Sequence, residues 1–85
     1  MVNSGIVTVD IHGKTKAQAK IAIDAALRKC DGSVYRIRVV HGFNRGTELR
    51  EMVRREYGAG GRVLRAEQGG NPGVTELVLR EQFER

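Results

Sequence analysis

Two segments of this chain share the same local order: β-branched residues, then a His-Gly pair, then a turn that leads into a predicted helix. The first segment is Val9 to Gly13, and the second is Val39 to Gly46. Strand–helix–strand crossovers are right-handed and place their two strands parallel in one sheet. Both His-Gly pairs are therefore expected at the same edge of one sheet, where α/β proteins commonly bind their ligands.

The length of the chain limits it to one domain. It has 85 residues, which we expect to form a single domain over 1–85 with a core from about 6 to 80. Trp is absent and aromatic residues make up only 5%, so Val, Ile, Leu and Ala must supply the core. No apolar stretch approaches the roughly 20 residues that cross a membrane, and the first residues lack the pattern of a secretory signal. The single Cys30 cannot form an internal disulfide, so we expect a cytoplasmic location and no membrane partner.

Hydrophobic periodicity predicts six elements in the order β-α-β-α-β-β. Alternation with a period of two indicates the first strand. The spacing of Thr15 and Gln18 fits a capping box, which opens a helix that ends near Cys30. The predicted strands cover 6–12, 34–41, 62–67 and 74–80, and the second predicted helix covers 47–57.

Two helices are too few to cover both faces of a four-stranded sheet. We therefore expect an α/β chain of the α+β two-layer sandwich type, with a mixed four-stranded sheet and both helices on one face. The first two strands should be parallel, and the last two should form an antiparallel hairpin. Arg36 and Arg38 alternate with apolar residues, so they should lie on the open, more polar face of the sheet.

The chain is basic, with a net charge of +5 and 11 Arg to 4 Lys. Arg binds phosphate through paired hydrogen bonds, so this balance favours DNA or RNA as the partner, although many domains without that partner are as basic. Arg36 and Arg38 are candidate phosphate-binding residues on the open face. Arg54 and Arg55 are either solvated helix residues or an extension of a phosphate-binding face.

Asp10 and His12 lie two residues apart, on one side of the first strand near its C-terminal end. A carboxylate beside an imidazole fixes the tautomer of the ring and makes a pair that can accept or donate a proton. We therefore treat Asp10 and His12 as candidate catalytic residues, together with His41 at the end of the second strand. The alternative is that Asp10 braces the turn and His12 is a hydrogen-bonded polar residue without a chemical role.

The turn after His41 is typical of an anion-binding site. Its glycines let the backbone approach a ligand, and the following helix presents free N–H groups and the positive end of its dipole. Glu48 in the first helical turn argues against an anion there, and an ordinary glycine-rich turn is the alternative. Phe43 either stacks on a base or folds down as a plug of the loop. The candidate nucleic-acid-binding and phosphate-binding residues of this segment are Gly42, Phe43, Arg45, Gly46, Thr47 and Arg50.

Three other kinds of site lack their signatures in this sequence. There is no nucleophile elbow, no Gly-Lys-Ser/Thr phosphate loop, and no cluster of three ligands at zinc spacing. We therefore assign no metal-binding residue and no cofactor. Cleavage of DNA would still need an activated water, which a divalent metal ion can supply.

Three separated motifs resemble the small MutS-related, or Smr, domain. Residues 9–13 resemble the Leu-Asp-Leu-His-Gly signature of that family, and residues 41–50 resemble its His-Gly-x-Gly…Leu-Arg signature. Residues 72–79 resemble its closing Gly-Val-Thr strand, so the resemblance covers 7–80 in the family's order. The turn after the second His-Gly pair is longer than the family pattern by about one residue, and Phe43-Asn44-Arg45 replaces the usual small basic-Gly step.

The resemblance implies a two-layer sandwich similar to the C-terminal domain of a bacterial translation initiation factor. It also implies binding of DNA or RNA, endonuclease activity that nicks DNA or cleaves RNA, and membership of a larger repair or ribosome-associated assembly. We expect a stand-alone, single-domain member of the family. The alternatives are a non-catalytic nucleic-acid-binding module and a protein-interaction module that uses an exposed sheet edge. The residues to which the resemblance assigns the function are Asp10, His12, His41, Gly42, Gly46 and Arg50.

Overall fold

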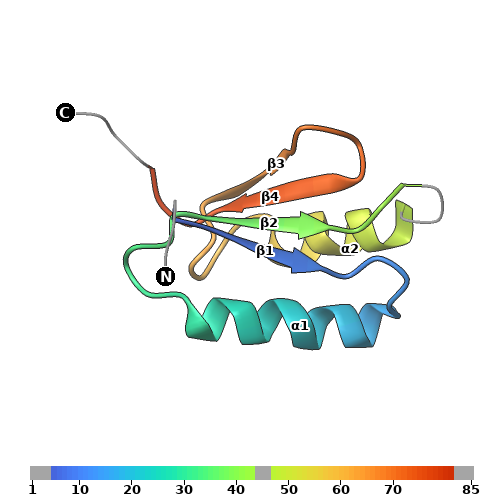
Figure 1. Ribbon diagram of the computed structural model, residues 1–85, viewed down its shortest axis with the longest axis horizontal. Coiled ribbons are helices and arrows are strands. Elements are labelled where there is room, and N and C mark those ends of the chain that lie inside the picture. The colour runs from blue at the N-terminus through green and yellow to red at the C-terminus, as the bar shows by residue number, and fades with distance from the viewer. Residues whose placement is uncertain (1–4, 44–46, 82–85) are drawn as a thin grey trace.

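Figure 1 shows a computed structural model of the chain, which describes residues 5–43 and 47–81. It contains the six expected elements in the expected order. They are β1 (Ile6–Asp10), α1 (Lys16–Lys29), β2 (Arg36–Val40), α2 (Thr47–Tyr57), β3 (Arg65–Gln68) and β4 (Val74–Val78). Within the described ranges, no helix is both long enough and apolar enough to cross a membrane.

The four strands form one mixed sheet in the order β1-β2-β4-β3. β1 and β2 are parallel, and β4 lies antiparallel to both β2 and β3. The predicted α+β fold class is therefore confirmed. β3 begins at Arg65 rather than at 62, because Val63 turns back on Gly60 and the two residues exchange backbone hydrogen bonds of 2.9 and 3.1 Å.

Both helices cover the same face of the sheet (Figure 1), with α1 against β1 and α2 against β3 and β4. Alternate residues of the paired strands point toward the helices and meet their apolar stripes. The parallel pairing of β1 with β2 places their C-terminal ends side by side. The buried cluster consists of Ile11, Ala19, Ile23, Ile37, Val39, Leu49, Met52, Val53, Val63 and Leu77.

The start of α1 is fixed by the predicted capping box. The Thr15 hydroxyl accepts a hydrogen bond from the backbone N–H of Gln18 at 3.1 Å, and the Gln18 side chain accepts one from the Thr15 N–H at 3.1 Å. These bonds satisfy two backbone groups near the helix start. Because the cap follows the first His-Gly pair so closely, the N-terminus of α1 stays near the end of β1.

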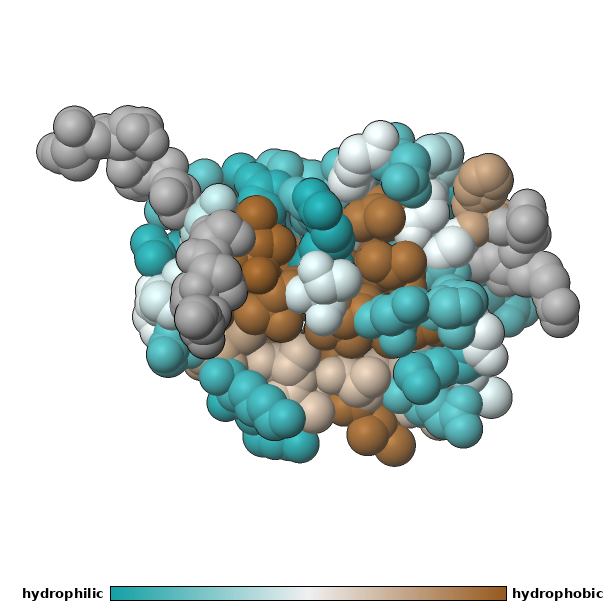
Figure 2. Space-filling model, in the orientation of Figure 1, coloured by the Kyte–Doolittle hydropathy of each residue, from teal (hydrophilic) through white to brown (hydrophobic). Residues whose placement is uncertain are grey.

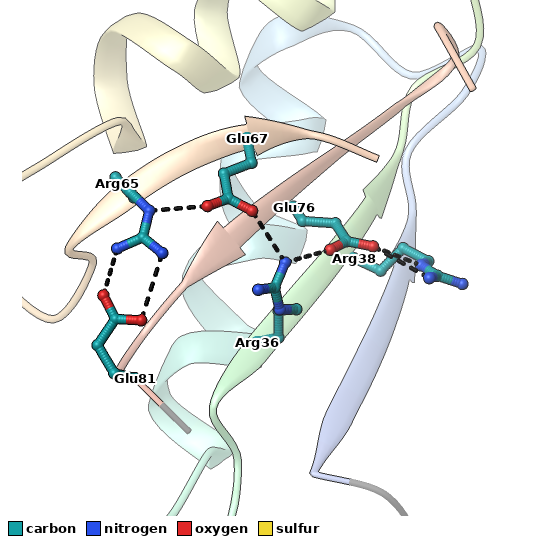
Figure 3. Close-up of polar contacts among 6 residues, drawn as sticks. All are labelled: Arg36, Arg38, Arg65, Glu67, Glu76 and Glu81. Carbon is teal, nitrogen blue, oxygen red and sulfur yellow. Dashed lines mark hydrogen bonds and ion pairs between the residues drawn. The ribbon is translucent and has the colours of Figure 1, made fainter. Parts of the chain in front are cut away.

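The face of the sheet opposite the helices carries a network of three arginines and three glutamates (Figure 3). Glu76 on β4 lies between Arg36 and Arg38 of β2, with oxygen–nitrogen distances of 2.5 and 3.0 Å. Glu67 on β3 contacts Arg36 at 3.2 Å and Arg65 at 2.7 Å. Arg36 and Arg38 lie on the open face of the sheet, as predicted, but carboxylates neutralise their charges. The members of this sheet-face network are Arg36, Arg38, Arg65, Glu67, Glu76 and Glu81.

β1 forms one edge of the sheet, and Figure 2 shows apolar surface along it and along α1. Ile21 on α1 is 68% exposed. A shallow groove of about 270 Å³ runs between the strand and the helix, and Cys30 lies in its wall. Burial raises the pKa of the Cys30 thiol, which favours a packing role over a reactive one.

Candidate functional site

The C-terminal ends of β1 and β2 open into a groove of about 740 Å³. α1 begins at Lys16 and α2 at Thr47. Because each helix follows one of two parallel strands, both helix N-termini lie at this edge of the sheet. The sequence indicated an anion site only at the start of the second helix, whereas the groove borders both helix starts. The groove is lined by His12, Gly13, Lys14, Thr15, Lys16, His41, Gly42, Phe43, Glu48 and Leu49.

Asp10 holds His12 beside this groove. Asp10 Oδ1 accepts hydrogen bonds from the ring Nδ1 of His12 at 2.6 Å and from its backbone N–H at 3.1 Å. These bonds lower the pKa of Asp10. A carboxylate can only accept, so the ring proton lies on Nδ1, and Nε2 has no partner within residues 5–43 and 47–81. The predicted pair therefore forms, and the same oxygen also braces the turn.

His41 lies at the base of the groove and is only 2% exposed. Its Nδ1 donates to the Gly42 carbonyl at 2.7 Å, and its Nε2 lies 2.8 Å from the Thr75 hydroxyl. Burial lowers the pKa of His41, which the nearby charges of Arg50 and Arg54 lower further. A neutral ring accepts the Thr75 hydroxyl proton at Nε2. Neither nitrogen is left for a substrate, so this geometry does not fit the acid–base role expected for His41.

Strand alternation explains why two similar His-Gly motifs differ. Asp10 and His12 belong to the alternate residues of the first motif that face away from the helices. His41 instead continues the alternation of Ile37 and Val39, which are fully buried beneath the helices. The same alternation is visible in the sequence. Applied to the second motif, it would have predicted that His41 is a buried residue.

The hairpin connection before β4 braces the second His-Gly pair. The Gly73 carbonyl accepts hydrogen bonds from the backbone N–H groups of His41 and Gly42, at 2.9 and 3.0 Å. Gly42 has a φ of +77°, and a Cβ on Gly73 would lie 3.2 Å from its Cα. Asn71 Oδ1 accepts the Gly73 N–H at 2.8 Å. Sequence reasoning treated this segment as a turn and missed the support from Asn71, Gly73 and Thr75; the Asn-Pro-Gly-Val-Thr run is the available signal.

Exposed cations and one aromatic ring surround the groove. Lys14 and Lys16 flank the α1 cap in its lining, and Phe43 is 54% exposed. The sequence analysis overlooked both lysines, because it considered only the second helix start as an anion site. A smaller adjoining pocket is lined by Gly42, Phe43, Thr47 and Arg50.

Four of the predicted site residues remain to be considered. Arg45 and Gly46 fall outside the described residues. Arg36 and Arg38 lie on the open face, where both are paired with Glu76, and neither lines the groove. In the part of the chain that the structure describes, no three His, Cys, Asp or Glu side chains form a group that could hold a metal ion.

Because His41 is buried, we expect the free energy of unfolding to decrease as the pH falls from about 6.5 toward 5. The pKa of His41 is lowered in the folded state from its ordinary 6.5. Below pH 6.5 the His41 ring is therefore protonated in the unfolded chain while it stays neutral in the folded chain. The free energy of unfolding should then fall with pH, by at most about 1.4 kcal/mol per unit. The carboxylates Asp10 and Glu67, whose pKa values are lowered, titrate below this window.

Urea unfolding at pH 7.5 and pH 5.5 measures this effect. His41→Gln is the matched control, because its amide offers a donor and an acceptor but does not titrate in this range. The difference in the free energy of unfolding between pH 7.5 and pH 5.5 should be smaller in that variant. An undiminished difference would assign the pH dependence to other groups.

Comparison with known proteins identifies the family. No family model and no curated protein matches the chain. Among solved structures, the crystal structure of the Smr domain of Thermus thermophilus MutS2 matches with a TM-score of 0.77 and 30% sequence identity. The match covers 88% of this chain and 99% of that chain. With its strand order and paired His-Gly turns, the chain therefore belongs to the Smr domain family.

Proposed function

We propose that this Smr domain binds DNA or RNA and cleaves the phosphodiester backbone in the groove between the starts of α1 and α2. One observation carries the proposal. The His12 ring is held by a carboxylate through Nδ1 at 2.6 Å, while its Nε2 has no hydrogen-bond partner among the described residues and its side chain is 70% exposed. An oriented, accessible imidazole of this kind is suited to moving a proton to or from a substrate.

The groove offers the charge that a phosphodiester needs. Two helix N-termini border it and contribute the positive ends of two helix dipoles, which favour an anion. Lys14 and Lys16 line the groove, and Arg50 lines the pocket beside it. Glu48 is the one acidic side chain in the groove lining and opposes the anion locally. These groups would also stabilise the charge that grows on phosphate in the transition state.

The chemistry assigns different roles to the two histidines. A neutral His12 accepts at Nε2 the proton of the attacking oxygen, and Asp10 stabilises the resulting imidazolium through Nδ1–H. The attacking oxygen bonds to phosphorus while the bond from phosphorus to the leaving oxygen breaks, and water supplies a proton to the leaving oxygen. His41 is a positioning residue, because its bonds to Gly42 and Thr75 fix the loop that ends the groove. Loss of His41 should therefore act through the position of Gly42 and Phe43 rather than through proton transfer.

The site works most readily on RNA, which carries its own nucleophile in the 2′-hydroxyl. DNA would require an activated water, and a divalent metal ion is one source of it. Phe43 is exposed beside the groove and offers a flat face on which an unpaired base can stack. A single-stranded or distorted segment is the substrate form that allows such stacking.

A cleavage assay tests the proposal. Labelled single-stranded RNA and supercoiled circular DNA are incubated with the wild type and with Asp10→Asn, each with and without a chelator. The Asn oxygen can still accept the backbone bond of His12, so the turn is kept while the charge is lost. We expect cleavage by the wild type, a rate at least about tenfold lower for Asp10→Asn, and similar binding.

Two outcomes would contradict the catalytic part. Equal cleavage by both proteins would point to a contaminating nuclease. Binding by both without any product would favour a non-catalytic nucleic-acid-binding module. The chelator arms decide whether a divalent metal takes part.

A further inference from the structure

The arginines of the described residues differ in their partners, and Arg62 and Arg80 donate to backbone carbonyls. Those on the sheet face are matched by carboxylates, as Figure 3 shows for Arg36, Arg38 and Arg65. The network joins three positive charges to three negative ones, so this face offers a polyanion little net attraction. By contrast, Arg54 and Arg55 on α2 form no ion pair with any residue in 5–43 or 47–81 and are exposed.

Helical spacing aligns the cations of α2 with the groove. Arg50 and Arg54 are four residues apart and share one side of the helix, about 6 Å apart along its axis. Arg50 already lines the pocket beside Phe43, and the charges of both arginines act on His41. Two like charges at this spacing repel each other, and a bound anion would relieve that repulsion.

A basic depression borders Arg54, on the side of α2 that carries Arg50 and Arg54. It has a volume of about 530 Å³ and an open mouth. Gln68 ends β3, which runs in the same direction as β2 because both are antiparallel to β4. The depression therefore extends from the sheet edge that carries the His12 groove. Its lining is Arg54, Arg55, Gly58, Ala59, Arg65, Ala66 and Gln68.

We propose that this depression is a second phosphate-binding subsite, and that a nucleic-acid strand runs from the His12 groove past Arg50 and along α2 into it. The inference rests on the proposed function and adds the path of the strand. Arg54 and Arg55 bind a backbone phosphate with their guanidinium N–H groups, and the Gln68 amide adds a further donor. Arg36 and Arg38 lie outside this lining, and Arg65, which borders the depression, is already paired with Glu67 and Glu81.

The last turn of a helix also favours cations because of the helix dipole, whatever they bind. α1 carries the same arrangement, with Arg28 and Lys29 in its last turn. The double variant Arg28→Gln/Lys29→Gln is therefore a matched control for Arg54→Gln/Arg55→Gln. Both remove two charges from a helix C-terminus, and only the second removes them from the proposed path.

Fluorescence anisotropy with a labelled single strand tests the path. One strand is short enough to fill only the His12 groove, and the other is long enough to reach the depression. We expect Arg54→Gln/Arg55→Gln to weaken binding of the long strand by about tenfold at low salt. The slope of log affinity against log salt concentration should become shallower by an amount that corresponds to about one to two phosphate contacts. Binding of the short strand, and its cleavage when bound, should be unchanged. The control variant should bind both strands like the wild type.

Three outcomes would overturn the path. Equal losses in both double variants would mean attraction by net charge alone. An unchanged affinity with a lower melting temperature would mean that Arg54 and Arg55 only stabilise the end of α2. A loss that is the same for short and long strands would place both arginines in the first site. Failure of the proposed function looks different, because the wild type would then cleave neither strand.

Discussion

Replacement of His12 by Ala is expected to lower the rate of phosphodiester cleavage by about a hundredfold or more, the usual contribution of a positioned general base. The fold should tolerate the change, because the ring is exposed and its described bonds go only to Asp10. Substrate binding should persist, since helix N-termini and lysines hold the phosphate in this account. Single-turnover cleavage of labelled RNA, with affinity measured on the same strand, separates the two effects.

Lys14→Gln is the matched control for this prediction. Lys14 lines the same groove and is exposed, but it has no geometry for proton transfer comparable to that of the His12–Asp10 pair. We expect Lys14→Gln to bind more weakly and to cleave the bound strand at nearly the normal rate. If His12→Ala instead lost affinity and kept its rate, His12 would be a binding residue only.

Replacement of His41 by Leu is expected to destabilise the fold by about 2–4 kcal/mol, the cost of leaving one buried and one half-buried polar group without partners. The Thr75 hydroxyl and the Gly42 carbonyl would both lose the ring that now bonds them. Leu has a similar size, so the loss reports hydrogen bonds more than a cavity. Urea unfolding at pH 7.5, where the native ring is neutral, measures the change.

A double-mutant cycle with Thr75→Val isolates one of these bonds. Val keeps the shape of Thr and removes the hydroxyl that faces His41. The double variant should be less destabilised than the sum of the single variants, because Thr75 is then no longer left unpaired. Strict additivity would show that the contact between the ring and the hydroxyl contributes nothing to stability.

Local patterns were sufficient to predict the elements of this fold. Alternation identified the strands, and the Thr15–Gln18 spacing identified the start of α1. The position of β4 between β2 and β3 depends on contacts far apart in the sequence, and no local pattern encodes it. The same holds for Glu76, which pairs with Arg36 and Arg38 from another strand. Charges that seemed free in the sequence are neutralised by partners about forty residues away.

The part of the candidate site that depends on local contacts was predicted, and the part that depends on contacts far apart in the sequence was not. The Asp10–His12 contact is local and follows from a spacing of two. The environment of His41 depends on Thr75 and Gly73, which come from the other end of the chain. Both helix N-termini lie at this edge because each helix follows one of two parallel strands, but the local motif indicated an anion site at the second one alone. Arg45 and Gly46 stay predictions, because they lie outside the described residues.

The central claim is that a phosphodiester lies in the groove beside His12. Titration of the isotopically labelled protein with a short single-stranded DNA, followed by NMR, tests it most directly. We expect the signals of His12, Lys14 and Phe43 to shift together and saturate, while those of Arg36 and Arg38 on the sheet face stay in place. Shifts confined to the sheet face, with His12 unaffected, would contradict it.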